Sequence, residues 1–461
     1  MTRLAIEYGA VNLSQGFPNQ SPPWGVKLAL AHGVLTGRPM DVSNNNADES
    51  NDGNENAATT TTTTTTTTPV EQLEASLAEI LQSHGASSTG DDLLNQYSPP
   101  CGRPDLRKAI ADYYNRFYGY EGVDPENVTI TLGATEALAS ALRTLGKPGD
   151  KCVIFEPFHE LYPSQCRLFY LETVYVTLRP TLGENSEWKY DPEELEAAME
   201  GARILVLNTP HNPTGKIFSL DELSHIAKLC VKHDVYLVTD DIYEHICFDN
   251  NSNSNSNKEK KQHLVVPQVL PELADRTLMC NSLGKSASAT GWRLGWCVHP
   301  SHLTDTYRGI HDQLVVMSPH PVQYATLSYL NLPDSYFSGL ATLYGNKVAK
   351  LGKALASCGF GVLPPEGAYY LFVEYGGVPL LNGLTSEAAA MHLLKEIGVA
   401  CVPGDNFYGK KNDPTTQHRY LRFAACRSDE DLDKAIALLQ SKLGTTTTTT
   451  KPCGDGGQGG D

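Results

Sequence analysis

Short apolar runs alternate with amphipathic stretches through the middle of the chain, and this alternation limits the fold more than any other feature. The runs are typical of strands buried on both faces, and the stretches between them have the spacing of helices. This order predicts an α/β protein with a mostly parallel sheet covered by helices. The strand-like runs are 128–132, 151–155, 174–178, 203–207, 235–239, 277–280 and 294–298.

Helix signals stand between and around these runs. Ser219 and Glu222 form a capping-box pattern before a helix with one apolar face. That face is predicted to hold Leu223, Ile226, Ala227, Cys230 and Val231. Further helices are predicted at 22–33, from 70 to about 81, at 105–114 and at 136–145.

A second, smaller domain is predicted after the alternation fades. The chain has 461 residues, which is long for one domain, and 40% of them are hydrophobic. A long helix at 336–360 and strands at 359–371, 398–403 and 420–425 indicate a small α+β C-terminal domain. The predicted division is an N-terminal arm at 1–35 that contributes to the small domain, a large domain at 70–313, and the small domain at 314–444.

Three stretches have almost no apolar residues to bury. They are 36–69, which holds the threonine run 59–68, then 250–262, and the tail 445–461. Such compositions predict two disordered insertions and a disordered tail.

Charge and composition exclude several classes of function. The formal net charge is −17, which argues against nucleic acid or an anionic membrane as the main partner. No run of 18 apolar residues occurs, and the first residues have no apolar signal core, so a cytoplasmic protein is expected. The 11 cysteines show no metal-ligand spacing, and no metal site is predicted.

Lys285 lies in NSLGKSASATGWRLGW, just after a predicted buried strand. A cation there is costly unless it is paired or neutral, and a neutral amine is the form that condenses with an aldehyde. Ser282 and Arg293 offer a hydroxyl and a guanidinium, which hold phosphate esters. An aldehyde and a phosphate together indicate pyridoxal phosphate. The rival interpretations are a solvated loop lysine and a nucleotide-binding P-loop, but Met279 stands where a P-loop needs its first glycine.

Other candidate residues follow the predicted strands, where sites in parallel sheets lie. Asp240 or Asp241 could face a protonated pyridine nitrogen, and strand alternation allows only one of them to do so. Gly133, Ala134 and Thr135 form a turn before a helix, which favours an anion. The other candidates are Phe158, Asn212 and Tyr243 near these strand ends, Tyr97 and Gly16 on rigid loops, and Arg422 in RYLRFAA. For Tyr97 and Tyr243 a packing role is the alternative, and for Arg422 a surface position.

The motifs VNLSQGFP, NQYSPP, GRPDLR, EPF, LNTPHNPTGK, VTDDIY, SATGWRLGW and RYLRFA stand in this order along the chain. With them the chain resembles fold-type I pyridoxal-phosphate enzymes. The resemblance is to class I/II aminotransferases of the kynurenine aminotransferase, glutamine transaminase K and methionine aminotransferase-like group. It implies a seven-stranded, mostly parallel sheet, a homodimer, and transfer of an α-amino group to a 2-oxo acid by a ping-pong mechanism.

The resemblance also implies a role for each residue. Lys285 would hold the cofactor covalently and move the substrate Cα proton, Asp240 would pair with the ring nitrogen, and Tyr243 and Asn212 would hold the ring oxygen. Phe158 would stack on the ring. Ala134, Thr135, Ser282 and Arg293 would bind the phosphate, with Tyr97 from the neighbouring subunit. Arg422, Asn212 and the backbone at Gly16 would bind the substrate carboxylate.

Three departures from the group's pattern affect these expectations. The N-terminal arm is short, and the phosphate turn reads GATEA where glycine-richer versions are usual. Val316 and Met317 stand where the kynurenine enzymes tend to have aromatic and histidine side chains. Donors of the kynurenine, glutamine or methionine type therefore all remain expected. The alternatives are a cysteine-S-conjugate β-lyase on the same scaffold and a non-catalytic module.

Overall fold

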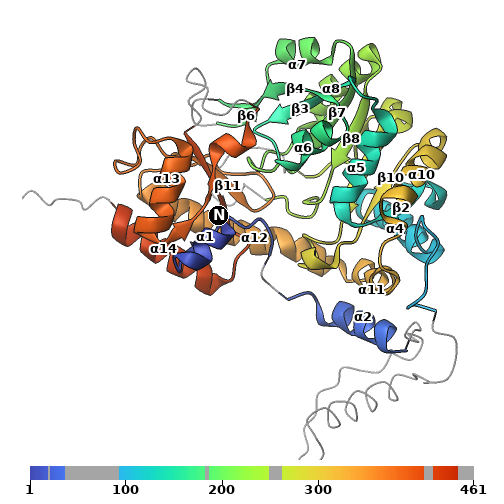
Figure 1. Ribbon diagram of the computed structural model, residues 1–461, viewed down its shortest axis with the longest axis horizontal. Coiled ribbons are helices and arrows are strands. Elements are labelled where there is room, and N and C mark those ends of the chain that lie inside the picture. The colour runs from blue at the N-terminus through green and yellow to red at the C-terminus, as the bar shows by residue number, and fades with distance from the viewer. Residues whose placement is uncertain (19–20, 37–92, 182–185, 249–261, 410–418, 445–461) are drawn as a thin grey trace, which may run out of the picture.

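The structure is a computed structural model that describes residues 1–18, 21–36, 93–181, 186–248, 262–409 and 419–444. The predicted insertions at 36–69 and 250–262 and the tail at 445–461 lie outside these residues, apart from 36 and 262. The helix predicted after residue 69 lies outside them as well. Figure 1 shows a large sheet-containing part and, beside it, a smaller part built around β11, α13 and α14.

The large part holds a seven-stranded sheet, as predicted. Every strand runs parallel to its neighbours except β10, which is antiparallel to both. In spatial order the strands are β2 (Val128–Thr131), β10 (Gly295–Val298), β9 (Thr277–Ser282), β8 (Tyr236–Asp240), β7 (Ala202–Asn208), β3 (Lys151–Glu156) and β4 (Glu172–Thr177). All seven apolar runs of the sequence form these strands.

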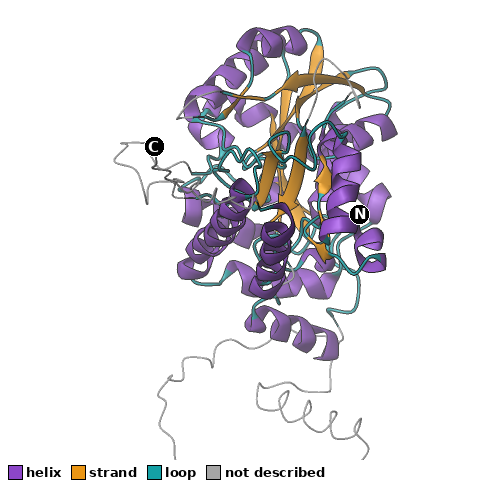
Figure 2. Cartoon of the chain, turned by 90° about the vertical axis from the view of Figure 1, so that its left-hand side faces the viewer, coloured by secondary structure: helices purple, strands orange, loops and turns teal. Residues whose placement is uncertain are grey.

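Helices cover both faces of this sheet (Figure 2). Val153, Leu205 and Leu237 point to one face and pack with the apolar residues of α7 and α8. Their chain neighbours Ile154 and Val206 point to the other face and pack with α5. The helices of this part are α4 (Pro104–Tyr118), α5 (Gly133–Leu145), α6 (Leu161–Leu168), α7 (Pro192–Met199), α8 (Leu220–His233), α9 (Val266–Val269) and α10 (Thr304–Val315). Burial on both faces explains why the strand sequences are apolar throughout.

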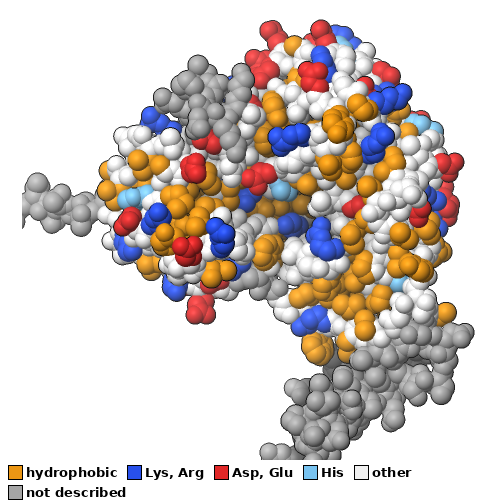
Figure 3. Space-filling view, viewed as in Figure 1, with side chains coloured by type: hydrophobic (Ala, Val, Ile, Leu, Met, Phe, Trp, Pro, Cys, Tyr) orange, Lys and Arg blue, Asp and Glu red, His pale blue; other side chains and the backbone are white. Residues whose placement is uncertain are grey.

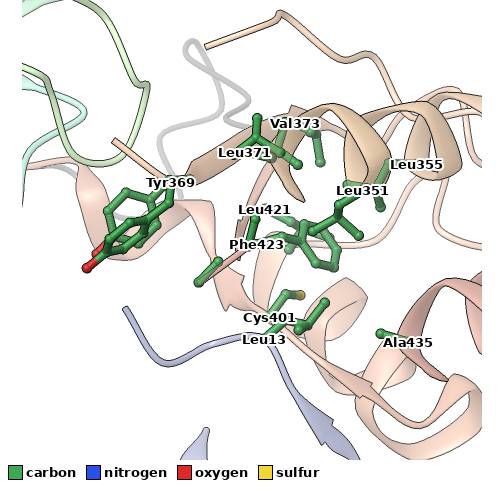
Figure 4. Packing of buried hydrophobic residues seen from close by; sticks show 14 of the residues in the cluster. Leu13, Leu351, Leu355, Tyr369, Leu371, Val373, Cys401, Leu421, Phe423 and Ala435 are labelled. Atoms are coloured by element: carbon green, nitrogen blue, oxygen red, sulfur yellow. The ribbon is translucent and has the colours of Figure 1, made fainter. Parts of the chain in front are cut away.

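The smaller part has its own three-stranded sheet and core. The sheet order is β11 (Tyr370–Glu374), β14 (Tyr420–Ala424) and β13 (Val402–Pro403), all antiparallel. Figure 4 shows Leu371 and Val373 of β11 in one apolar core with Leu351 and Leu355. The helices here are α12 (Asp334–Ser357), α13 (Ser386–His392) and α14 (Asp429–Leu443).

The N-terminal residues belong to the smaller part. After α1 (Thr2–Glu7), β1 (Val11–Asn12) pairs in parallel with β12 (Val399–Ala400). Leu13 continues this contact, since its N–H donates to the Ala400 carbonyl (3.0 Å), and its own carbonyl accepts from the N–H of Ala424 in β14 (2.9 Å). The chain then leaves through α2 (Trp24–Thr36), which lies beside α11 (His320–Leu330) in Figure 1. The exact domain boundaries given above stay predictions.

Two local expectations were wrong. Of the strand expected at 359–371, only the last two residues lie in β11, because Pro364 and Pro365 cannot donate to a ladder. In α8, Val231 is 48% exposed, and Leu229 is buried instead. The capping box itself is present: Ser219 Oγ accepts from the Glu222 N–H (3.2 Å), and Glu222 Oε2 accepts from the Ser219 N–H (2.9 Å).

We expect Ser219→Ala to lower the free energy of unfolding by about 1 kcal/mol, because the first turn of α8 loses its side-chain acceptor. Urea denaturation followed by circular dichroism measures this change. Ser224→Ala, inside the same helix, is the control and should not destabilise the protein. Equal unfolding midpoints for Ser219→Ala and the unmodified protein would contradict the prediction.

Candidate active site

Lys285 is the buried amine at the centre of the site. It follows β9, and its Nζ donates to the carbonyl oxygen of Gly16 in the N-terminal segment (2.6 Å). Burial lowers the pKa of Lys285 to about 8; the cations of Arg422 and Arg293 also lower it, while Cys426 and Asp240 oppose the shift. A substantial fraction of this amine is therefore neutral near neutral pH, as an amine that condenses with an aldehyde must be.

Asp240, at the end of β8, is 1% exposed and holds one unpartnered oxygen. Its Oδ2 accepts from the Tyr162 hydroxyl (2.7 Å), while Oδ1 is buried and has no hydrogen-bond partner among the described residues. Burial raises the pKa of Asp240 to about 6. The adjacent Asp241 differs, because its Oδ2 accepts from Thr239 Oγ1 (2.6 Å). Of the two acids, Asp240 is the one with a free acceptor.

The start of α5 and the end of β9 form a cradle of small residues. Gly133, Ala134 and Thr135 open the helix, and Thr135 Oγ1 accepts from Arg293 Nη2 (3.3 Å). Ser282 ends β9 and pairs with Gly295 of β10. A Cβ on Gly295 would lie 2.8 Å from the Ala134 nitrogen. Free N–H groups at a helix start, a hydroxyl and a guanidinium together suit a phosphate.

Arg422, on β14, is 7% exposed and lies close to two aromatic rings. Its Cζ lies 4.6 Å from the ring centroid of Tyr370 and 4.9 Å from that of Phe407. At the edge, Nη1 donates to Asn212 Oδ1 (3.0 Å) and Nη2 donates to the Ser14 carbonyl (3.1 Å). Its Nε is buried without a partner among the described residues. A guanidinium fixed in this way binds a carboxylate through its edge.

The remaining predicted residues differ in how they relate to this centre. Tyr243 is buried, and the centroid of its ring lies 6.0 Å from Lys285 Nζ. The ring of Phe158 stacks on Tyr175 (5.4 Å between centroids), whereas the neighbouring His159 has a buried Nδ1 without a partner among the described residues. The stacking role of Phe158 stays a prediction, and His159 is a second candidate for it. Tyr97 is 80% exposed.

Contacts join Lys285, Tyr243 and Arg422, and the charge of Asp240 acts on Lys285, in a site that suits pyridoxal phosphate and an amino acid. Gly16 contacts Lys285 and Tyr370, and Tyr370 contacts both Tyr243 and Arg422. The unpartnered acceptor of Asp240 suits a protonated ring nitrogen, and the unpartnered Nε of Arg422 suits a carboxylate oxygen.

Sequence analysis missed Tyr162, His159, Tyr370 and Phe407. In the sequence these residues look like core aromatics or, for His159, like a loop residue. Only their contacts distinguish them. Tyr162 contacts Asp240, Tyr370 and Phe407 contact Arg422, and His159 contacts Tyr162. These contacts exist only in the tertiary fold.

A separate cavity of about 320 Å³ lies away from these residues. Its lining includes Phe117, Tyr118, Glu244, His245 and His263. Glu244 accepts there from Tyr113, Tyr118 and Asn281, so its carboxylate is already satisfied.

Within the described ranges, no three His, Cys, Asp or Glu side chains are grouped so that they could bind a metal ion. Over the same ranges, every helix is too short or too polar to cross a membrane.

Comparison with known proteins agrees with this geometry. The curated relatives include a probable kynurenine–oxoglutarate transaminase of Saccharomyces cerevisiae, 32% identical over 76% of this chain and 80% of that protein. They also include kynurenine–oxoglutarate transaminase 1 of Mus musculus, 30% identical over 92% of this chain and 89% of that protein.

Two solved structures are similar as well. A methionine aminotransferase from Escherichia coli, YbdL, has a TM-score of 0.75 and 27% identity, and the match covers 95% of each chain. Bna3p from Saccharomyces cerevisiae, described as a putative kynurenine aminotransferase, has a TM-score of 0.74 and 28% identity over 95% of this chain and 94% of that one. The profile of the family "Aminotransferase class I and II" matches residues 55–439. The chain therefore belongs to the class I and II aminotransferases, which are pyridoxal-phosphate enzymes.

Proposed function

We propose that this aminotransferase moves the α-amino group of a neutral amino acid, of the kynurenine, methionine or glutamine type, to a 2-oxo acid by a ping-pong mechanism. The observation that carries the proposal is the arrangement around Lys285. A buried amine lies close enough to a carboxylate with one unpartnered oxygen and to a guanidinium with one unpartnered nitrogen for both charges to act on its pKa, and Gly16 and Tyr370 join the amine to the guanidinium. Kynurenine and methionine enzymes among the relatives support the choice of donor.

Pyridoxal phosphate supplies an aldehyde that accepts amino groups and a pyridine ring that withdraws electrons from the substrate Cα. Asp240 would hold a proton on the ring nitrogen, because a carboxylate in a dry site stabilises the cation opposite it. Tyr162 keeps that carboxylate in place by donating to Oδ2. Ser282, Arg293 and the first residues of α5 would hold the phosphate, and Tyr243 and Asn212 would hold the ring oxygen.

Lys285 would take the proton from the substrate Cα and return it to the cofactor side. This requires an amine that can lose its proton near physiological pH, and burial with two nearby cations brings the pKa of Lys285 down to about 8. Arg422 would bind the α-carboxylate and so place Cα within reach of Lys285. The Gly16 carbonyl accepts from Lys285 in this structure and also contacts Tyr370, whose ring in turn contacts Arg422.

The loop around Val316 supports a neutral side chain on the donor. Val316 is the centre of a γ-turn (φ 65°, ψ −60°) closed by the Met317 N–H and the Val315 carbonyl (2.7 Å). Few β-branched residues adopt positive φ, and such strain is common at ligand sites. Met317 Sδ accepts from the Ser98 N–H (3.2 Å), which ties this loop to the loop that carries Tyr97. Val316, Met317 and Tyr97 on these two loops would form an apolar rim of the site, here called the lip, which offers no charge to a donor side chain.

We also propose that two copies form a homodimer in which this lip completes the site of the partner. Several large apolar side chains are exposed here: Trp24 (72%), Leu93 (59%), Tyr97 (80%) and Val316 (49%). Figure 3 shows hydrophobic side chains gathered over α2 and α11 on this face. A hydrophobic patch of this kind on a soluble protein marks an interface. Tyr97 of this patch would reach the phosphate of the cofactor bound to the partner subunit.

The donor is tested with a panel of amino acids against several 2-oxo acids. Methionine, glutamine or kynurenine should exceed aspartate at least about tenfold in kcat/KM, because the site has one carboxylate-binding arginine and an apolar lip. Arg422→Gln should raise KM for every donor about a hundredfold. Arg419→Gln is the matched control, since Arg419 Nη1 donates to Asn382 instead (3.3 Å), and it should leave KM unchanged.

A preference for aspartate would contradict the proposed donor class. Release of pyruvate and ammonia from cysteine conjugates without a 2-oxo acid would indicate elimination instead of transfer.

The amine is tested by the pH dependence of its reaction with pyridoxal phosphate. When apoprotein is mixed with the cofactor and trapped with borohydride, the initial rate should rise with pH and have its midpoint near 8, where half of Lys285 has lost its proton. An ordinary lysine would still be gaining neutral form up to about 10.4. Lys285→Ala should give no trapped adduct.

Two charge variants sharpen this test, because the two charges act on Lys285 in opposite directions. Arg422→Met should move the midpoint up, since the arginine lowers the pKa of Lys285. Asp240→Asn should move it down, since the carboxylate raises that pKa. A midpoint near 10 in the unmodified protein, or two shifts of the same sign, would contradict the assignment.

The shared site is tested by mixing two inactive variants. Unfolded and refolded together, Lys285→Ala and Tyr97→Ala should recover about a quarter of the unmodified activity, because half the dimers are hybrids and each hybrid has one intact site. A mixture of Lys285→Ala with Asp240→Ala should stay inactive, since both residues belong to the same subunit's site. No recovery in the first mixture would show that Tyr97 acts within its own subunit, and full activity of Tyr97→Ala alone would show that Tyr97 is not needed.

A further inference from the structure

Tyr370 is a buried residue at the start of β11 that contacts three parts of the site and has no role assigned above. It is 1% exposed. Its hydroxyl lies 2.9 Å from the Tyr243 hydroxyl and donates to the Gly16 carbonyl (3.2 Å). Its ring covers one face of the Arg422 guanidinium, 4.6 Å from Cζ. One side chain therefore meets the candidate ligand of the ring oxygen, the N-terminal segment and the candidate ligand of the carboxylate.

Backbone pairing explains why the ring meets Arg422. In the β11–β14 ladder, Phe372 lies opposite Arg422, and Tyr370 is two residues before Phe372. Residues two apart on a strand point to the same face, and a diagonal neighbour lies within reach of a large ring. The ring centroid of Phe407 also lies near the guanidinium, 4.9 Å from Cζ. Two aromatic rings therefore pack against Arg422 and restrict the plane of its guanidinium.

The hydroxyl of Tyr370 can take part in either of two hydrogen bonds. The Gly16 carbonyl has two lone pairs, but three donors reach it: Lys285 Nζ (2.6 Å), Tyr369 (3.3 Å) and Tyr370 (3.2 Å). Tyr369 can satisfy this carbonyl alone, so the proton of Tyr370 is available to the oxygen of Tyr243. Tyr243 then keeps its own proton for a further acceptor.

Glycine at position 16 permits this contact. A Cβ there would lie 2.2 Å from the Tyr370 hydroxyl oxygen, so any side chain would push Tyr370 away from Tyr243 and Arg422. The close approach of a glycine backbone to a tyrosine hydroxyl is a feature of the built site.

We propose that Tyr370 is a positioning residue that joins the two halves of the site: its ring fixes the plane of Arg422, and its hydroxyl donates to Tyr243 so that Tyr243 donates to the cofactor's ring oxygen. This inference rests on the proposed function. A chain of two hydroxyls strengthens the last hydrogen bond, because each donor is polarised by the one before it. The hydroxyl and the ring therefore have separable effects, one on the cofactor and one on the carboxylate.

Tyr370→Phe separates them, because it removes the hydroxyl and keeps the ring. In the holoenzyme, the pH midpoint at which the absorbance of the bound cofactor changes should rise by about half a unit or more, since a weaker hydrogen bond to the ring oxygen favours the protonated form. The inhibition constant of a straight-chain carboxylic acid without an amino group should stay within about twofold, since the face of Arg422 is still covered.

Tyr370→Leu removes the ring as well. It should show the same rise in the absorbance midpoint and, in addition, about tenfold weaker inhibition by the carboxylic acid. Tyr344→Phe is the matched control. Tyr344 is another buried tyrosine, and the ring of Tyr369 separates it from Tyr243. Its loss should change neither quantity.

Either of two results would overturn the proposal. An unchanged or lowered midpoint in Tyr370→Phe would show that the hydroxyl does not support Tyr243 or competes for its proton. Unchanged inhibition in Tyr370→Leu would show that the ring does not hold Arg422. Failure of the proposed function looks different, since the unmodified protein would then still show the cofactor absorbance but would transfer no amino group from these donors to a 2-oxo acid.

Discussion

The site depends on keeping water away from one amine and one carboxyl group. In water a lysine stays protonated to a pH above 10, and an aspartate loses its proton near 4. Burial disfavours both charged forms, so it lowers the pKa of Lys285 to about 8 and raises that of Asp240 to about 6. Burial thus moves the pKa of a base and the pKa of an acid toward 7 from opposite directions. The chemistry of the site follows from where the fold places these groups.

Two asparagines connect the backbone of Asp240 with Arg422 across the two parts of the molecule. Asn208 is paired with Asp240 in the β7–β8 ladder, and its side chain donates to the Asp240 carbonyl (2.7 Å). The same side chain accepts from the Asn212 N–H (2.7 Å), and Asn212 in turn accepts from Arg422 (3.0 Å). A hydrogen-bonded path therefore runs from the large sheet to the small one. A buried hydrogen-bonded path of this kind fixes the two sheets relative to each other, because a buried donor or acceptor that loses its partner costs free energy.

Much of the fold could be predicted from the sequence, because strands buried on both faces leave continuous apolar runs. The acid and the amine could be predicted as well, since a charged residue directly after such a run is unusual. Tyr370 and Tyr162 could not, because a tyrosine in an apolar context has the same pattern whether it packs or positions a ligand. The ring that stacks on the cofactor could not be assigned from the sequence either. Adjacent residues after a strand point in opposite directions, and only the structure shows that Phe158 stacks on Tyr175 while His159 has an unpartnered ring nitrogen.

The pairing of β1 with β12, together with the bond from Ala424 to Leu13, has a consequence for how the protein is made. The segment with β1 is synthesised long before β12, so its strand has to wait for that later segment before it has a partner. Every strand of the large sheet is already synthesised by Val298, well before Ala424 appears. A nascent chain can therefore have the large sheet, Lys285 and Asp240 already made while Arg422, the proposed ligand of the substrate carboxylate, is still missing.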